Sequence, residues 1–223
     1  MAPEHDHRPA TRDAAATRRR ILDAATTEFA AHGLAGGRTA HIVQIAGTSQ
    51  RMIYAYFGNK DGLFGAALEH NIRRIHDAAP FDVDDLPGYA QQIFDFYRDN
   101  PHLARLEMWQ ALERPDAMQS IPVIKASLDD KTAALEQAQA AGSVNASLPA
   151  AHLLDLILTL THGHPMNAGD AASWTDDQRD ALADGVAALT GQPADKHRLA
   201  DEPGLPAQDG QRTTGRAPMS SSG

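Results

Sequence analysis

The 223-residue sequence contains no cysteine, and aromatic residues make up only 5% of it. The absence of cysteine excludes disulfide bonds and thiolate metal ligands, and it is compatible with a reducing compartment. Long apolar runs are also missing, since the richest stretch, residues 153–160, is interrupted by Asp155 and Thr159. This stretch is too short to cross a bilayer, and the first residues lack the apolar core of a signal peptide. We therefore expect a cytoplasmic protein without membrane association.

Strand patterns are absent as well. No segment alternates apolar and polar residues with β-branched enrichment, whereas alanine-rich stretches with apolar residues four apart recur along the chain. The sequence therefore predicts an all-α fold. We expect a disordered arm at 1–11, an N-terminal helical domain at 12–78, a C-terminal helical domain at 79–191 and a flexible tail at 192–223. The longer helices are expected over 12–32, 60–77, 86–99, 101–114, 117–141, 150–163 and 175–190.

Two short helical patterns meet at a glycine between residues 38 and 60. Ile42 and Ala46 lie one turn apart on one face of the first pattern. Gly47 supplies the left-handed residue that ends a helix, and Ser49 can cap the next one. The sequence therefore predicts two helices that meet at a steep angle.

The second of these helices presents polar side chains outward. Ile53 and Phe57 lie four residues apart and are expected to face the core, which turns Arg51 away from the fold. Gln50 lies in the first turn, the end that usually enters the major groove, where Gln pairs with adenine and Arg with guanine. This layout is typical of a DNA-reading helix-turn-helix. The alternative is an ordinary helix corner with a solvated arginine.

The charge distribution favours the first interpretation. The whole chain carries a net charge of −9, yet residues 8–60 hold eight basic and three acidic side chains, a charge of +5. Residues 77–223 hold ten basic and twenty-two acidic side chains, a charge of −12. A basic N-terminal part joined to an acidic body that DNA would repel suits a protein that contacts DNA with one end.

Three spaced segments, 17–25, 29–34 and 53–64, flank and complete the corner: Thr-Arg-Arg-Arg-Ile-Leu-Asp-Ala-Ala, Phe-Ala-Ala-His-Gly-Leu and Ile-Tyr-Ala-Tyr-Phe-Gly-Asn-Lys-Asp-Gly-Leu-Phe. Together with the corner they resemble the tetracycline-repressor-like (TetR) family over roughly residues 17–68. The resemblance implies a two-fold dimer with a four-helix interface and a roughly palindromic DNA site.

The same resemblance assigns roles to the N-terminal residues. It implies that Gln50 and Arg51 face bases, whereas contacts to the DNA backbone are implied for Arg38, Thr39, Ser49, Tyr54, Tyr56 and Lys60. For Lys60 the chemistry agrees, because Asn59 can cap a helix whose first amides suit a phosphate. The sequence departs from the family at Val43, Thr48 and Arg51, where Ala, Val and a small residue are common. Arg51 could therefore contact a base or only a phosphate.

Two further sets of apolar residues suggest a ligand pocket and a dimer interface. The pocket candidates lie in 86–99 and 101–114 and are Phe94, Tyr97, His102, Leu106, Trp109 and Gln110. An aromatic stripe at helical spacing also fits a plain core. The interface candidates lie in 150–163 and 175–190 and are Leu153, Leu154, Ile157, Leu158, Leu182, Val186 and Leu189. The alternative is that 150–163 is a central core helix.

No catalytic constellation supports an enzyme, because a phosphate loop, a nucleophile elbow and a zinc-helix motif are all missing. His152, Asp155, His162 and His164 are loosely spaced for a metal site, and the paired aspartates fit helix starts better than a magnesium site. We expect no metal and no cofactor. The sequence predicts a DNA-binding regulator, most simply a repressor released by a small apolar molecule. The alternative is a helical small-molecule-binding protein or all-α enzyme with a structural N-terminal corner.

Overall fold

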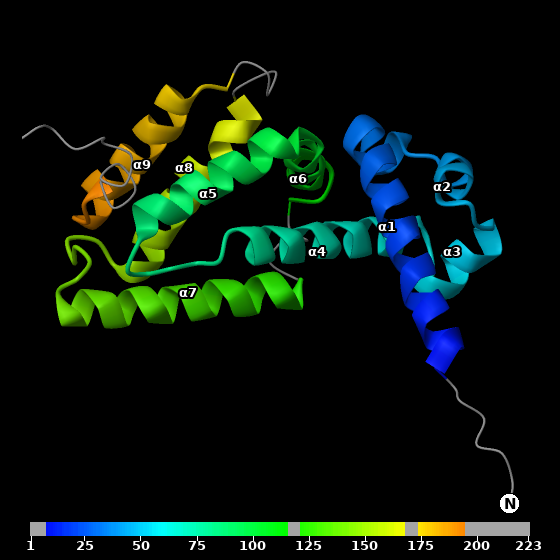
Figure 1. The fold of residues 1–223 in the computed structure, drawn as a ribbon, viewed down its shortest axis with the longest axis horizontal. Coiled ribbons are helices and arrows are strands. Elements are labelled where there is room, and N and C mark those ends of the chain that lie inside the picture. The colour runs from blue at the N-terminus through cyan, green and yellow to red at the C-terminus, as the bar shows by residue number, and fades with distance from the viewer. Residues whose placement is uncertain (1–7, 116–120, 168–173, 195–223) are drawn as a thin grey trace, which may run out of the picture.

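The computed structural model describes residues 8–115, 121–167 and 174–194, and these parts of the chain contain helices and no strand (Figure 1). The helices are α1 (Arg8–Gly36), α2 (Thr39–Ala46), α3 (Gln50–Phe57), α4 (Lys60–Ala78), α5 (Leu86–Asp99), α6 (Pro101–Glu113), α7 (Pro122–Ala141), α8 (Ala150–Asn167) and α9 (Asp176–Thr190). Helices α1 to α3 form one end of the molecule, and α4 runs from them alongside α7 into the C-terminal bundle (Figure 1). The expected all-α fold is confirmed.

Several helix limits differ from those predicted. Helix α1 begins at Arg8, so residues 8–11, expected in a disordered arm, are helical. Pro9 is tolerated there because the first turn of a helix needs no N–H from it. Helix α7 begins at Pro122 for the same reason, and α8 continues past Pro165 to Asn167. Residues 1–7 of the expected arm and 195–223 of the expected tail lie outside the described residues.

Two hydrophobic cores are joined through α6. The N-terminal core gathers buried residues of α1 to α4, among them Phe29 and Phe64, whose rings meet edge to face at 5.1 Å. Leu106 of α6 belongs to this core as well. Leu103, one turn earlier on α6, belongs instead to the C-terminal core of α5, α7, α8 and α9. A single helix is thus buried on both sides, which fixes the two domains to one another.

Side chains of α6 also satisfy the backbone groups that are left without a helical hydrogen bond at a break in α1. The backbone of Gly33 leaves the helical region (φ 69°, ψ −177°), a conformation that favours glycine, one residue past the expected end of this helix at 32. The Leu34 N–H, which in an unbroken helix would bond the Ala30 carbonyl, instead donates to the Glu113 carboxylate at 2.7 Å. The Ala30 carbonyl accepts from Trp109 Nε1 and Arg105 Nε, each at 3.3 Å. Side chains of α6 therefore satisfy both halves of the broken bond.

Candidate nucleic-acid interface and internal pocket

The turn between α2 and α3 has the geometry that the sequence predicts. Gly47 is left-handed (φ 57°, ψ 47°), and the Ser49 hydroxyl accepts a hydrogen bond from the Met52 N–H at 3.3 Å. Ile42 and Ile53 are fully buried beneath the turn. The two short helices are therefore held by the N-terminal core, and their outer side chains are free to contact another molecule.

The outer face of α3 is polar and exposed. Gln50 and Arg51 are both exposed at the start of the helix. The Gln50 amide donates to the Tyr54 hydroxyl at 3.3 Å and lies 3.5 Å from the Thr39 hydroxyl. Within the described residues the Arg51 guanidinium has neither an ion pair nor a hydrogen bond. The N-terminal end of α3 thus presents the Gln50 carboxamide next to the Arg51 guanidinium, which has no partner among the described residues.

The residues expected at the DNA backbone lie on the α1–α2 turn, on α2, at the N-cap of α3, within α3 and at the start of α4. Arg38, Ser49 and Tyr54 are exposed, whereas Thr39, Tyr56 and Lys60 are half-buried. Lys60 has an internal partner, since its ammonium donates to the Ala35 carbonyl at 3.0 Å. The Asn59 side chain caps α4 by accepting from the Gly62 N–H at 2.7 Å, as predicted. Phe57, expected to face the core, is only half-buried, and the Arg18 guanidinium covers its ring at 5.4 Å.

Glu28 is a buried carboxylate next to the corner that the sequence analysis missed. Its side chain is 1% exposed and accepts the Arg38 N–H at 2.8 Å and His41 Nδ1 at 2.5 Å. Burial raises the pKa of Glu28, but the hydrogen bonds from His41 and from the Arg38 backbone outweigh this effect and hold the pKa below its ordinary value. A lone carboxylate beside the buried Phe29 was the available signal. Glu28 therefore holds the start of α2 against α1.

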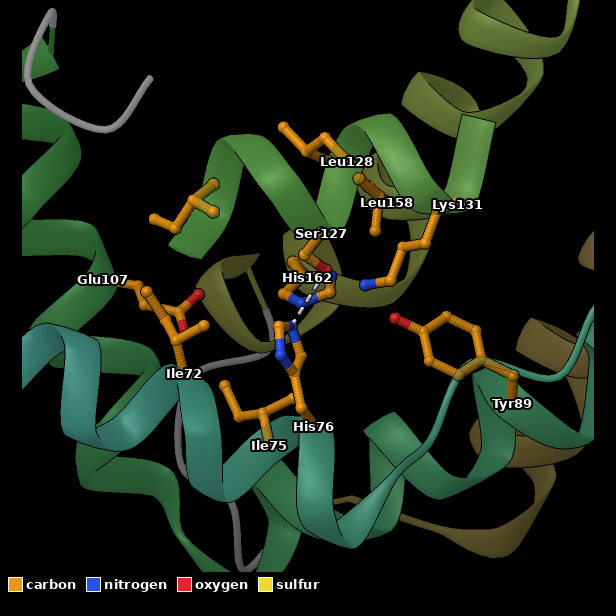
Figure 2. Close-up of a pocket in the computed structure, with 11 residues that line it drawn as sticks. Ile72, Ile75, His76, Tyr89, Glu107, Ser127, Leu128, Lys131, Leu158 and His162 are labelled. Carbon is orange, nitrogen blue, oxygen red and sulfur yellow. Dashed lines mark hydrogen bonds between the residues drawn. The ribbon is translucent and has the colours of Figure 1, made fainter. Parts of the chain in front are cut away.

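A pocket of about 270 Å³ lies between α4, α5, α6, α7 and α8 (Figure 2). Its apolar wall is made by Ile72, Ile75, Ile124, Leu128 and Leu158. Its polar groups come from His76, Tyr89, Glu107, Ser127, Lys131 and His162. An apolar cavity with a few convergent polar groups is the usual form of a small-molecule site.

Two polar residues of the pocket are strongly affected by burial. Glu107 is 6% exposed and accepts a hydrogen bond from the Tyr97 hydroxyl at 2.7 Å. Burial raises the pKa of Glu107 to about 7, although the bond from Tyr97 opposes the rise. Burial, and to a lesser extent the charge of Lys131, lower the pKa of His162 to about 4. Near neutral pH His162 is therefore uncharged, and Glu107 is close to its midpoint.

None of the six predicted ligand residues lines this pocket. Phe94 and Leu106 are buried in the two cores. Tyr97 does not line the pocket but contacts two residues that do: its hydroxyl bonds Glu107, and its ring meets the His162 ring edge to face. The remaining three have other surroundings: Trp109 bonds the Ala30 carbonyl, Gln110 Nε2 donates to the Arg114 carbonyl at 2.7 Å, and His102 is exposed at the start of α6. The aromatic stripe of α5 and α6 thus forms core, the alternative that its helical spacing left open.

Five of the seven predicted interface residues are buried inside the subunit. These are Leu153, Leu154, Ile157, Leu182 and Val186. Of the remaining two, Leu158 lines the pocket and Leu189 packs against the C-terminal core. Buried side chains have little surface left for a partner. Within residues 150–163 of α8, the exposed large apolar residues are instead Leu156 and Leu160, 41% and 37% exposed.

Two other kinds of site were sought among the described residues. In that part of the chain no helix is long and apolar enough to cross a membrane. No group of three or more histidine, aspartate or glutamate side chains there could hold a metal ion. The side chain of His164, one of the loosely spaced metal candidates, lies outside the described residues.

A helix-turn-helix with an exposed polar helix, attached to a helical bundle with an internal pocket, defines a DNA-binding regulator with a ligand-binding domain. Residues 21–67 match the model of bacterial regulatory proteins of the tetR family, and residues 85–189 match the tetracyclin repressor-like C-terminal domain. The chain is 35% identical to the HTH-type transcriptional repressor SCO4008 of Streptomyces coelicolor over 69% of this chain and 80% of that protein. The chain belongs to the TetR family of bacterial transcriptional regulators.

Solved structures agree with this assignment. The transcriptional regulator SCO4942 of Streptomyces coelicolor is 32% identical, with a TM-score of 0.68 over 79% of this chain and 99% of that chain. GusR of Salmonella enterica shares the fold at 20% identity, with a TM-score of 0.64 over 78% of this chain and 95% of that chain.

Proposed function

We propose that this protein is a cytoplasmic, non-enzymatic transcriptional repressor that binds a roughly palindromic operator as a homodimer and leaves it when a small molecule enters the pocket. The observation that carries the proposal is the exposed start of α3, where Gln50 and an unpaired Arg51 project from a rigid corner. Gln and Arg are well suited to read adenine and guanine in the major groove. Arg38, Thr39, Ser49, Tyr54, Tyr56 and Lys60 are the proposed contacts to the DNA backbone.

The path from pocket to DNA runs through two helices. Helix α4 lines the pocket with Ile72 and Ile75, and its first residue, Lys60, bonds the Ala35 carbonyl beside the corner. Helix α6 lines the pocket with Glu107, and its last residue, Glu113, accepts the Ala35 N–H. A molecule that displaces either helix therefore moves the end of α1. In a dimer this motion changes the separation of the two α3 helices, which must match major grooves about 34 Å apart.

The proposed dimer interface uses the two helices that the sequence indicates, α8 and α9, with different side chains. Leu156 and Leu160 are exposed apolar residues of α8, and they lie one turn apart on one face. We expect wild-type protein to sediment as a dimer at micromolar concentration and the double variant Leu156→Glu, Leu160→Glu to sediment as a monomer, because two carboxylates would be buried in the interface.

The matched control is Leu112→Glu on α6, which changes a side chain that is 72% exposed and belongs to neither of the two helices of the proposed interface. This variant is expected to remain a dimer. A monomeric wild type, or a dimer that survives both α8 substitutions, would contradict the proposed interface.

The DNA-binding proposal is tested by selecting bound fragments from random DNA and then measuring affinity for the recovered site. Arg51→Ala is expected to weaken binding by about 1–3 kcal/mol and to relax the preference at one base pair of each half-site. If Arg51 contacts only phosphate, the loss is similar for all sequences.

Arg73→Ala is the control for this measurement. Arg73 is an exposed arginine of α4 that pairs with Glu69 at 2.5 Å, outside the corner. It is expected to bind the operator like wild type. Selection that enriches no sequence, or equal affinity of the Arg51 variant and wild type for all fragments, argues against the proposed role of α3.

A further inference from the structure

Hydrogen-bond donors gather at one end of the pocket. Lys131 of α7 and Tyr89 of α5 point toward one another there, and the bonded pair Ser127 and His76 lies beside them (Figure 2). The Lys131 ammonium lies 5.6 Å from the ring centroid of Phe81 and 5.7 Å from that of Tyr89. Among the described residues it has neither an ion pair nor a hydrogen bond, and the Tyr89 hydroxyl has no hydrogen bond. The two groups are therefore available to a bound molecule.

The contrast with Lys125, on the same helix, is informative. The Lys125 ammonium pairs with Asp129 at 2.6 Å in solvent. Lys131 instead turns its ammonium inward, where burial lowers its pKa, and its charge in turn lowers the pKa of His76 and of His162. Lys131 is thus a half-buried cation that lies against two aromatic rings and has no counter-ion among the described residues. Such a cation creates a positive potential that favours an anion.

The carboxylate of the pocket lies at the other end from the Lys131 ammonium. Glu107 is the carboxylate among the lining residues of the described chain, and Figure 2 shows it at the opposite end from Lys131. Neither charge contributes to the pKa shift of the other, although the Glu107 charge acts, after burial, to raise the pKa of Tyr89. Glu107 also accepts the Tyr97 hydroxyl at 2.7 Å. The counter-ion that Lys131 lacks is therefore not supplied by Glu107.

The space between the two ends is apolar and small. Ile72, Ile75, Leu128 and Leu158 line it. A volume of about 270 Å³ is just under twice that of a 150 Å³ cavity that holds benzene, so it accommodates about eleven non-hydrogen atoms. A compact molecule with one ring or a short chain fits, and a large planar drug does not.

We propose that the molecule bound in this pocket is a small organic acid, whose carboxylate pairs with the Lys131 ammonium and accepts a hydrogen bond from the Tyr89 hydroxyl, while its apolar body lies against Ile72 and Leu158. The inference rests on the proposed function only in naming this molecule as the effector. The charge-assisted hydrogen bond supplies orientation, and burial of the apolar body supplies most of the affinity.

The test compares three probes of nearly equal size in calorimetric titrations with the full-length protein: phenylacetate, its neutral amide phenylacetamide, and the cation 2-phenylethylamine. We expect phenylacetate to bind at least ten-fold more tightly than the amide, and the amine to bind most weakly. Lys131→Met, which keeps the length of the side chain, is expected to remove the preference for the acid. Tyr89→Phe is expected to reduce it.

Lys125→Met is the matched control on α7 and should bind all three probes like wild type. Glu107→Gln removes a negative charge from the pocket and should increase the preference for the acid. The proposal is overturned if the amine binds best and Glu107→Gln abolishes that binding, if the three probes bind equally, or if none binds at 10 mM. Operator binding by the same preparations separates the two hypotheses. If the protein binds an operator but no acid, only this inference is refuted. If it binds the acid but selects no operator, the proposed regulatory function is refuted.

Discussion

Replacing Phe29 by alanine is expected to lower the free energy of unfolding by about 3–5 kcal/mol, the usual cost of removing a fully buried aromatic ring. Phe29 has no exposed surface, and its ring meets Phe64 edge to face. The packing is tight enough that a methyl group added at Gly37 would lie 2.6 Å from the Phe29 ring. The surrounding helices therefore have little freedom to close the cavity.

Urea denaturation followed by circular dichroism measures this change, and Leu112→Ala, at a largely exposed position, is the control. Because Leu106 of α6 shares the core with Phe29, we expect the variant to unfold in one transition at a lower urea concentration. A loss of less than about 1 kcal/mol, or separate unfolding of the N-terminal domain, would contradict this description of the core.

Glu107→Gln is expected to leave stability nearly unchanged near pH 4 and to increase it by about 3 kcal/mol at pH 8. Burial raises the pKa of Glu107 from 4.5 to about 7. Between these two values the folded protein binds more protons than the unfolded chain. Wild-type stability therefore falls as the pH rises from about 4.5 to 7, and the glutamine variant escapes this loss. Glutamine also retains an oxygen that accepts the Tyr97 hydroxyl.

The measurement is the difference in unfolding free energy between variant and wild type across pH 4 to 8, in which effects of other titrating groups cancel. Glu136→Gln, at an exposed position on α7, serves as the control for the substitution itself. A difference for Glu107→Gln that does not change with pH would mean that its carboxylate is not desolvated in solution.

Features that depend on neighbouring residues were predicted well from the sequence. Gly47 ends α2, and Ser49 and Asn59 cap the helices that follow them, because the signals for turns and caps lie within a few residues. The two-helix corner follows from such signals alone. Its exposed Gln50 and Arg51 follow from helical periodicity once Ile53 is assigned to the core.

Features that depend on how helices pack were predicted poorly. Helical spacing places Tyr97 and Ile157 on the apolar stripes of their helices, but it cannot tell whether a stripe faces a cavity, a partner or its own core. The signal for the pocket was a charged residue on an apolar helix face: Lys131 lies one turn from Leu128 and from Leu135 on α7, and Glu107 lies one turn from Leu103 on α6. This signal can be recognised only when it is known that α6 and α7 line the same pocket.

Because α6 is packed into both hydrophobic cores, it limits which parts of this protein can be exchanged with the corresponding parts of its relatives. A hybrid regulator joined after residue 78 would separate the Gly33 break from Glu113 and Trp109, which satisfy it. Such a chimera would expose an unsatisfied N–H and a mismatched surface at Leu106. A working exchange of DNA specificity has to transfer the matching side chains of residues 101–113 together with the N-terminal domain, so operator choice and effector choice cannot diverge independently at this seam.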